Sequence, residues 1–484
     1  MTGLFGILVA LGLLIVLAYR GVSVLLLAPL CAMLAAAFAG APLLGLYTQV
    51  FMTSAGGFII SFFPLFLLGA IFGRLMDDSG SAKAIAQGLV ARLGGGQAIL
   101  AVVLACAILT YGGVSLFVVA FAIYPIAANL FREADIPKRL IPATIALGAF
   151  TFTMTALPGT PAIQNAIPMP FFGTTPFAAP GLGLIASAVM LGFGLWWVGL
   201  RERAARRAGE GFEGAAPAPM AVAGETRVRE LATVAREFDP AELAHGAPAP
   251  RLPSFLPSVL PLAAVLLVNV AMSFVVLPRM DAAFLGEERW GNTSISAVGG
   301  VWAVIVALAA GIAVLLALHW QRLPNLKESV DSGANASVLP VLSVGSLVGF
   351  GGVVAAMPAF AVVRDWVLGI GGGPLVSLAA AITVLSALTG SASGGMTIAL
   401  GTLGETYVRL AAEYGIEPAL MHRIAVMSSG TLDCLPHNGA VVTLFKVCGT
   451  THAESYGDLV MSVIVGPVIA LVVVIALGSL FGSF

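Results

Sequence analysis

The residues best suited to chemistry in this chain are an acid and a base in an otherwise apolar stretch. Asp433 is the only acidic residue between Arg423 and Lys446, and His437 follows it four residues later. A carboxylate inside a membrane segment costs about 2.5 to 3.5 kcal/mol on insertion scales and is a functional candidate by default. Burial raises the pKa of a carboxyl group and lowers that of a histidine, so both can titrate near physiological pH. We therefore predict that Asp433, His437 or the pair carries a proton. The alternative is a helix cap at Asp433 beside a packed His437.

Four polar interruptions rich in glycine and proline carry the other candidates. They cover residues 110–115, 155–165, 389–395 and 430–439. Glycine frees the backbone, and proline removes an N–H and clashes with the preceding turn, so helices stop or kink there. The helix N-termini exposed in this way suit a carboxylate, because their N–H groups are unpaired and the helix dipole is positive there. The predicted substrate-binding residues are Gly112, Gly113, Ser115, Thr155, Thr160, Gln164, Asn165, Thr389, Ser391, Ser393, Gly394, Gly395 and Asn438.

Glycine and serine also serve close helix packing in membranes, which is the alternative for any single position. Four interruptions in two related pairs favour a binding site.

The elements that position these residues must be membrane helices. Hydrophobic residues make up 59% of the chain, charged residues 10%, and the mean hydropathy is +1.01. A span needs about 20 apolar residues, and several charge-free runs are long enough for two. These runs are residues 21–73, 93–131, 140–200, 252–278, 290–318, 332–363, 366–404 and 459–484. Residues 262–268 are apolar on every side, unlike the alternating strands of a barrel. The predicted fold class is an all-α polytopic membrane protein with broken helices and helical hairpins.

One polar segment divides the chain into an N-terminal transmembrane repeat (1–200), a linker (201–255) and a C-terminal transmembrane repeat (256–484). The linker begins with an arginine cluster, which places it in the cytoplasm. We expect a disordered tether. The alternative is a short amphipathic helix, because Val228, Leu231, Val234 and Phe238 recur at helical spacing.

Three small motifs recur in the same order and at nearly the same spacing in the two halves. Residues 93–96 correspond to 370–373, residues 112–115 to 394–397, and residues 156–159 to 434–437. The loop before Gly94 is basic and therefore cytoplasmic, whereas the charges around the second half place the Gly371 loop outside. Two inverted repeats are predicted, an architecture that places the binding site near the bilayer midplane.

Several classes of protein are excluded or disfavoured. The formal net charge of −1 gives no reason to propose nucleic acid as a partner. The four cysteines lie in apolar segments without metal-ligand spacing, and neither a phosphate-binding loop nor a zinc-protease motif is present, so no metal and no cofactor is predicted. Ser115 with His437 as base would be a minimal intramembrane protease, but nothing else supports an enzyme. His319 and His422 lie beside loop charges and are expected to be solvated.

Three segments of the chain resemble those of the gluconate:proton symporter (GntP) family. They are residues 157–168 (LPGTPAIQNAIP), residues 388–395 (LTGSASGG) and residues 435–439 (LPHNG). The resemblance covers essentially the whole chain outside the linker. It implies a proton symporter of the bacterial inner membrane for gluconate or related hydroxy acids. It also implies the fold of the ion transporter superfamily, a homodimeric scaffold and elevator-like movement.

The substrate follows less directly. After Asn438 the chain continues with the apolar Ala440, Val441 and Val442, which suit a short, partly apolar acid better than a polyol. This resembles the branch of 3-hydroxybutyrate permeases, so we favour a short hydroxy monocarboxylate over gluconate. The partners predicted are a small organic acid anion, a proton and the lipid bilayer. A sodium-coupled symporter or an exchanger is the alternative, because oxygens at Thr389, Ser391 and Ser393 can also ligate sodium.

Overall fold

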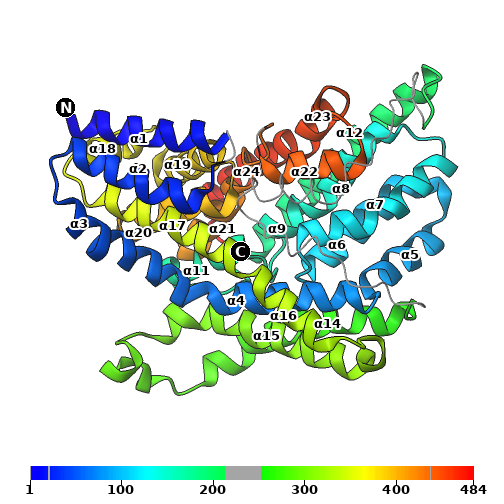
Figure 1. Ribbon diagram of the computed structural model, residues 1–484, viewed down its shortest axis with the longest axis horizontal. Coiled ribbons are helices and arrows are strands. Elements are labelled where there is room, and N and C mark those ends of the chain that lie inside the picture. The colour runs from blue at the N-terminus through cyan, green and yellow to red at the C-terminus, as the bar shows by residue number, and fades with distance from the viewer. Residues whose placement is uncertain (1, 20–21, 213–251, 437) are drawn as a thin grey trace.

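The computed structural model describes residues 2–19, 22–212, 252–436 and 438–484. All regular elements in those ranges are helices, which confirms the predicted all-α class (Figure 1). The predicted proton carrier His437 lies outside the described residues. So does most of the predicted linker, including its amphipathic segment.

Six helices in the described part are long and apolar enough to cross a membrane. They are Leu43–Asp78, Pro180–Arg207, Phe255–Arg279, Ile295–Arg322, Leu326–Ala355 and His452–Phe481. Shorter apolar helices of 10–17 residues precede these spans or lie between them, and at 1.5 Å per residue they are shorter than a hydrocarbon core of about 30 Å. The chain is therefore a multi-pass membrane protein that combines full spans with interrupted ones.

The helices of the N-terminal half run up to the undescribed segment. They are α1 (Thr2–Tyr19), α2 (Val24–Phe38), α3 (Leu43–Gly45), α4 (Met52–Asp78), α5 (Ser81–Leu93), α6 (Ala98–Tyr111), α7 (Leu116–Glu133), α8 (Ile141–Ala149), α9 (Phe152–Thr155), α10 (Ile163–Ala166), α11 (Met169–Phe172) and α12 (Pro180–Arg207). A 3₁₀ turn at Lys138–Leu140 precedes α8. Helix α12 runs through position 200, so the first residues of the predicted linker are helical.

The helices of the C-terminal half begin at Phe255. They are α14 (Phe255–Ala271), α15 (Ile295–His319), α16 (Leu326–Ala336), α17 (Val338–Ala355), α18 (Phe360–Leu368), α19 (Gly373–Thr389), α20 (Ala392–Glu413), α21 (Pro418–Ser429), α22 (Gly439–Cys448), α23 (His452–Val460) and α24 (Gly466–Phe481).

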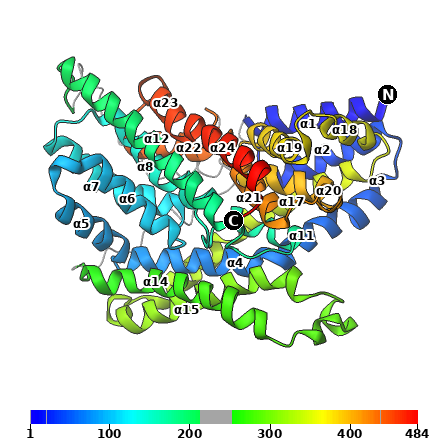
Figure 2. The same cartoon turned by 180° about the vertical axis from the view of Figure 1, so that it is seen from behind.

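Helix α4 is the longest element in the middle of the assembly, and α15, α16 and α17 pack against it. In both views α14 and α15 run along one edge of the molecule beneath α4 (Figures 1 and 2). Helices α1 and α2 lie at one end with α17, and α5 to α8 lie at the other.

Both halves contain the same two devices in the same order. Helices α6 and α7 pack against each other as a hairpin, and α19 and α20 do the same in the second half. Each hairpin is followed by an interrupted helix, α8 to α10 in the first half and α21 to α22 in the second. All four predicted interruptions separate helices. The inverted relation of the two halves stays a prediction.

The second hairpin differs from the prediction in where its break ends. Helix α19 ends at Thr389 and α20 begins at Ala392, so Ser393, Gly394 and Gly395 form the first turn of a helix rather than a break. Close approach explains the glycine: a Cβ at Gly395 would lie 2.3 Å from the backbone nitrogen of Ser386. Helices α19 and α20 therefore meet at a distance that no larger residue allows.

Candidate functional site

A cavity of about 180 Å³ lies where the interrupted segments of both halves meet α4, α15 and the junction of α16 and α17. Leu65 and Leu308 belong to its apolar wall. Its polar side chains are Thr110, Ser115, Gln164, Ser337 and Ser393. No Asp, Glu, Lys, Arg or His is among its lining residues in the described part of the chain. The site therefore offers hydroxyl and amide groups without a formal charge.

Two helix N-termini, one from each half, face this cavity. Ser115 is the N-cap of the 18-residue helix α7, and both Ser115 and Leu116 line the space. Ser391 is the N-cap of α20, and Ser393 in its first turn lines the same space. Each N-terminus carries about half a positive charge in its N–H groups. The cavity is thus electropositive without a cationic side chain.

The tip of the first hairpin, at residues 110–115, contacts the interruption at residues 155–165, which is called the first interruption from here on. The hydroxyl of Tyr111, at the end of α6, donates a hydrogen bond of 2.7 Å to the carbonyl of Pro158. Gly113 has φ +98°, a conformation that favours glycine, and a Cβ there would lie 3.1 Å from Pro161. The neighbouring Gly112 packs against the side chain of Leu262 on α14 and faces away from the cavity lining.

The first interruption is held open by two buried asparagines. The Nδ2 group of Asn165 donates to the carbonyls of Thr160 and Pro176, each at 3.0 Å. Asn269 on α14 donates to the carbonyl of Gly159 at 2.9 Å. These bonds satisfy backbone groups that would otherwise be orphaned where the helix is broken. Asn165 and Thr160 thus shape the site from behind and do not line the cavity.

The tip of the second hairpin is organised by its own hydroxyls. The Oγ of Ser391 accepts the backbone N–H of Gly394 at 2.9 Å and lies 3.5 Å from the Oγ of Ser393. The hydroxyl of Thr389 donates to the carbonyl of Leu385 at 2.8 Å. Of these residues only Ser393 reaches the cavity.

The interruption at residues 430–439, called the second interruption from here on, is also stabilised by a buried asparagine. The Nδ2 group of Asn438 donates to the carbonyls of Gly390 and Asp433, each at 3.0 Å, and its Oδ1 accepts the N–H of Val441 as the N-cap of α22. Asn165 likewise reaches the carbonyl five residues before it. The side chain of Asp433 is buried, with the residue 9% exposed, as the sequence predicts for an intramembrane carboxylate.

The cavity gathers only part of the predicted set. Gly113, Ser115, Gln164 and Ser393 line it. The other described members of the set lie in the interruptions but do not line the cavity: Gly112, Thr155, Thr160, Asn165, Thr389, Ser391, Asp433, Gly394, Gly395 and Asn438.

Two residues that the sequence analysis did not select are among the most deeply buried polar groups. His422 and Arg423 on α21 are both 0% exposed, so the expectation of a solvated His422 is wrong. His319 is also buried, at 2% exposed. Arg423 donates to the carbonyl of Ala178 through Nη2 at 2.6 Å and Nε at 3.1 Å, and to that of Thr155 at 3.5 Å. No carboxylate contacts this guanidinium among the residues that the structure describes.

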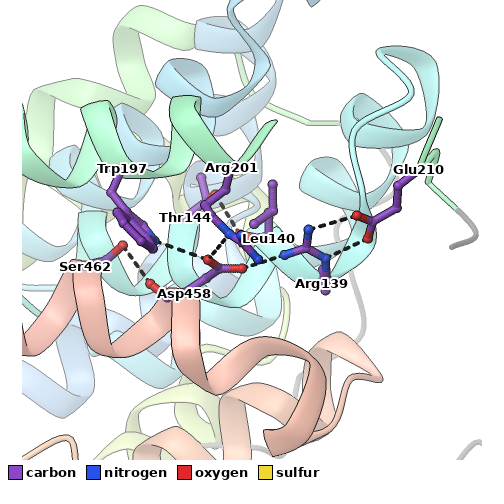
Figure 3. Close-up of polar contacts among 8 residues, drawn as sticks. All are labelled: Arg139, Leu140, Thr144, Trp197, Arg201, Glu210, Asp458 and Ser462. Atoms are coloured by element: carbon purple, nitrogen blue, oxygen red, sulfur yellow. Dashed lines mark hydrogen bonds and ion pairs between the residues drawn. The ribbon is translucent and has the colours of Figure 1, made fainter. Parts of the chain in front are cut away.

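An ionic cluster joins the two halves at another place (Figure 3). One carboxylate oxygen of Asp458 on α23 accepts Arg201 Nε at 2.7 Å and Trp197 Nε1 at 3.2 Å, and the other accepts Arg139 at 2.6 Å. Arg139 also makes two bonds to Glu210, at 2.6 and 2.9 Å. The hydrogen bonds from Arg139 lower the pKa of the Glu210 carboxyl, and that pairing raises the pKa of Arg139.

Membrane-length helices with paired hairpins and interrupted helices around an uncharged polar cavity define the chain as a membrane transporter. Solved transporters share this fold. The YdaH transporter of Alcanivorax borkumensis aligns with a TM-score of 0.52 at 17% identity, covering 89% of this chain and 88% of that one. MtrF of Neisseria gonorrhoeae aligns with the same score at 12% identity, covering 89% and 83%.

The sequence relatives fix the family. The model of the GntP family permeases matches residues 2–170. The uncharacterized transporter YxjC of Bacillus subtilis is 42% identical over 98% of this chain and 98% of its own length. The chain belongs to the GntP permease family. Its relatives and structural neighbours are transporters, in agreement with the expectation that it is not an enzyme.

Proposed function

We propose that this permease takes up a small hydroxylated monocarboxylate, either 3-hydroxybutyrate-like or gluconate, together with a proton. The observation that carries the proposal is the meeting of the N-termini of α7 and α20 at one uncharged polar cavity. A carboxylate placed there would accept N–H groups from both halves of the chain, and the hydroxyl and amide side chains would bind a hydroxyl of the substrate. Apolar walls such as Leu65 and Leu308 suit the carbon chain.

The composition of the cavity wall favours the shorter acid. Only five of its lining side chains carry a hydroxyl or amide group, and the others are apolar or glycine. The several hydroxyl groups of gluconate would find fewer partners there than the single hydroxyl of a short, partly apolar acid.

Arg423 supplies a full positive charge near the site. It is 0% exposed, and it reaches the carbonyl of Thr155, next to Met154 in the cavity wall. A buried charge without a partner of opposite sign is costly. An anion in the cavity would compensate it, so substrate binding and the buried arginine support each other.

Asp433 is the proposed carrier of the coupled proton. It is a buried carboxylate in the second interruption, and its backbone carbonyl accepts a hydrogen bond from Asn438. A proton on Asp433 would neutralise the intramembrane carboxylate during transport. Sodium coupling is the rival, because the oxygens of Thr389, Ser391 and Ser393 cluster at the second hairpin tip.

Uptake into proteoliposomes tests the proposal. Labelled D-3-hydroxybutyrate should accumulate under an inward proton gradient, collapse with a protonophore, persist when choline replaces sodium, and be competed by gluconate. Accumulation that requires sodium would transfer the coupling to that ion, and absence of gradient-driven uptake of both acids would refute the proposal.

Variants locate the site. Ser393→Ala and Gln164→Ala should each raise the concentration for half-maximal uptake about two- to tenfold, since a hydrogen bond between neutral groups contributes about 0.5 to 1.5 kcal/mol. Thr402→Ala is the matched control, because Thr402 lies on the same helix as Ser393 and donates within it to the carbonyl of Ile398 at 2.7 Å. Asp433→Asn should abolish proton-driven accumulation.

A further inference from the structure

The most deeply buried histidine of the described chain is bonded at both ring nitrogens. His422 Nε2 lies 3.1 Å from Oδ1 of Asn165, and Nδ1 lies 2.6 Å from the hydroxyl oxygen of Thr174. These partners come from the N-terminal half, whereas α21 belongs to the C-terminal half. The ring thus bridges the halves beside the first interruption.

The hydrogen-bond network fixes which nitrogen carries the proton. The amide of Asn165 must point its Nδ2 at the two carbonyls of Thr160 and Pro176, because a flipped amide would place oxygen against oxygen. Its Oδ1 is then an acceptor, so His422 Nε2 must be the donor. In the neutral ring Nδ1 is therefore an acceptor, and the hydroxyl of Thr174 donates to it.

The same heavy-atom geometry can hold one more proton. If Nδ1 is protonated, it donates to Thr174, whose hydroxyl also accepts and only has to rotate. The bond from Nε2 to Asn165 is the same in both states. No side chain or helix has to move for the ring to gain or lose its proton.

We propose that His422 is a proton-binding residue of this transporter, with Thr174 as the hydroxyl that accommodates both of its protonation states. This inference rests on the proposed proton coupling and adds to it a residue outside the predicted set. His422 takes the proton at Nδ1 and returns it from the same atom.

The position of the ring between two spaces supports this role. Thr174 is half-buried and lines a groove of about 340 Å³ that it shares with Phe177 and Ala419. On the other side of the ring, Asn165 directly follows Gln164, which lines the central cavity. A proton on His422 therefore lies between a groove and the proposed substrate site.

The charges around the ring link its proton to the substrate. Helices α9, α10, α11, α19 and α24, which pack against α21, carry no ionisable residue. Helix α20 carries three exposed ones (Glu405, Arg409 and Glu413) and the buried Tyr407, whose hydroxyl meets that of Ser377. Arg423 is the adjacent charge on α21 itself, and Tyr111 lies near it.

Arg423 opposes a second positive charge at His422, and an anion in the cavity offsets Arg423. Binding of the anion must then favour binding of the proton, and the reverse, because such coupling is reciprocal.

Nuclear magnetic resonance of the full chain in nanodiscs, with ¹⁵N-labelled histidine, tests the inference without a transport assay. At neutral pH the His422 ring should be the Nε2–H tautomer, and on acidification it should gain a proton while the protein stays folded. Saturating D-3-hydroxybutyrate should move that midpoint to higher pH by about one unit, a tenfold change in proton affinity. His422→Gln identifies the signal of this ring. Thr174→Val, which removes the rotating hydroxyl, should shift the midpoint pH of its protonation whether or not the substrate is present. An Nδ1–H tautomer, or a ring that stays neutral until unfolding, would overturn the inference.

Transport then separates the inference from the proposed function. His422→Gln should still exchange labelled for unlabelled D-3-hydroxybutyrate at equal pH, but lose about tenfold in proton-driven accumulation. Thr174→Val should shift the pH profile of uptake and Thr174→Ser restore it, while Thr402→Ala, the control on α20, should have no effect. Wild-type uptake that ignores the proton gradient refutes the proposed function, whereas proton-driven uptake that His422→Gln retains in full refutes only the role of His422.

Discussion

Asp458 and Arg423 are both buried charged side chains, and their surroundings differ in kind. Asp458 on α23 has a side chain that is 4% exposed, and it receives two guanidinium groups and an indole N–H (Figure 3). Arg423 on α21 is 0% exposed, and the partners of its hydrogen bonds within the described chain are the backbone carbonyls of Ala178 and Thr155. The first charge is compensated inside the protein, and the second is not compensated among the described residues.

The difference separates a structural charge from a functional one. Asp458 joins α12 and the turn before α8 to α23, so its bonds tie segments more than two hundred residues apart in sequence. Its negative charge is already balanced by Arg139 and Arg201, so no ligand is required to compensate it. Arg423 has hydrogen-bond partners but no counter-charge among the residues that the structure describes, which makes its neighbourhood favourable for an anion that enters and leaves. Removing each charge should therefore damage a different property.

Asp458→Asn should give the largest loss of stability. The substitution leaves Arg139 and Arg201 facing a neutral amide, and breaking a buried ion pair typically costs about 3 to 5 kcal/mol. Because both arginines keep some contact with solvent, we expect about 3 kcal/mol at the lower end of that range. Thermal and denaturant unfolding of the purified protein measure it.

Asp365→Asn is the control, since Asp365 pairs with its neighbour Arg364 at the surface with 68% of its side chain exposed. Equal stability of the Asp458 and Asp365 variants would contradict a structural role for the buried cluster.

Arg423→Met should show the opposite pattern, with a small loss of stability and a large loss of uptake. The two carbonyls lose their donors, at about 1 to 3 kcal/mol, while removal of an uncompensated buried charge offsets part of this. Uptake of D-3-hydroxybutyrate should fall at least about tenfold, equivalent to about 1.4 kcal/mol. Arg423→Lys, which keeps the charge, should retain more uptake than Arg423→Met. If Met and Lys transport alike, the charge at this position is not used.

Gly183→Ala changes the packing around Arg423 and leaves the charge of Arg423 unchanged. A Cβ at Gly183 on α12 would lie 2.5 Å from the carbonyl oxygen of Ala156 and 3.4 Å from the guanidinium carbon of Arg423. Forcing an atom into such a packed position costs about 1 to 3 kcal/mol, so the variant should unfold more easily and transport less.

Gly192→Ala and Gly199→Ala test the same helix where a new Cβ meets no atom within 4 Å. These controls should be neutral or slightly stabilising, because alanine favours a helix. If Gly183→Ala were as stable and as active as these controls, the close packing at Gly183 would not be needed for the fold or for transport.

The sequence predicted the helical membrane fold and the places where helices stop, because both depend on local composition. Glycine and proline end a helix wherever they occur, so the interruption at Pro158 can be recognised without a partner. Asp433 could be predicted as buried, because it is the only acidic residue between Arg423 and Lys446 in an otherwise apolar stretch. The helical start at Ala392 was missed because Ser391 acts as an N-cap, which resembles a loop residue in sequence.

The residues at His422 and Arg423 could not be found in the same way. Their partners at Asn165, Thr174 and Ala178 lie some 250 residues earlier, and only the packing of α21 against the first interruption brings them together. A charge in a short polar stretch is usually solvated, so the sequence pattern favoured the wrong environment. The available signal was that Arg423 directly borders a long apolar segment with no acidic residue beside it.

Glu210→Gln should have the smallest effect, and its pH dependence sharpens the view of the Asp458 cluster as a permanent ionic contact. Arg139 lowers the pKa of Glu210 below its unfolded value of about 4.3. A carboxyl group with a lowered pKa stabilises the fold above its unfolded pKa and loses this contribution as the pH falls through the folded pKa. Because Glu210 is 28% exposed, the contribution at neutral pH should be less than about 1 kcal/mol.

The stabilities of the wild type and Glu210→Gln should therefore differ slightly at pH 7 and converge below pH ~4. Arg139 stays charged over this whole range, since pairing with Glu210 raises its pKa further, so the change must come from the carboxyl group. Glu202→Gln is the control at a helical pair with Arg206, where the effect should be similar or smaller. A stability difference that increased on acidification would mean that the folded state favours the protonated carboxyl of Glu210. The cluster would then respond to pH and would not be a permanent ionic contact.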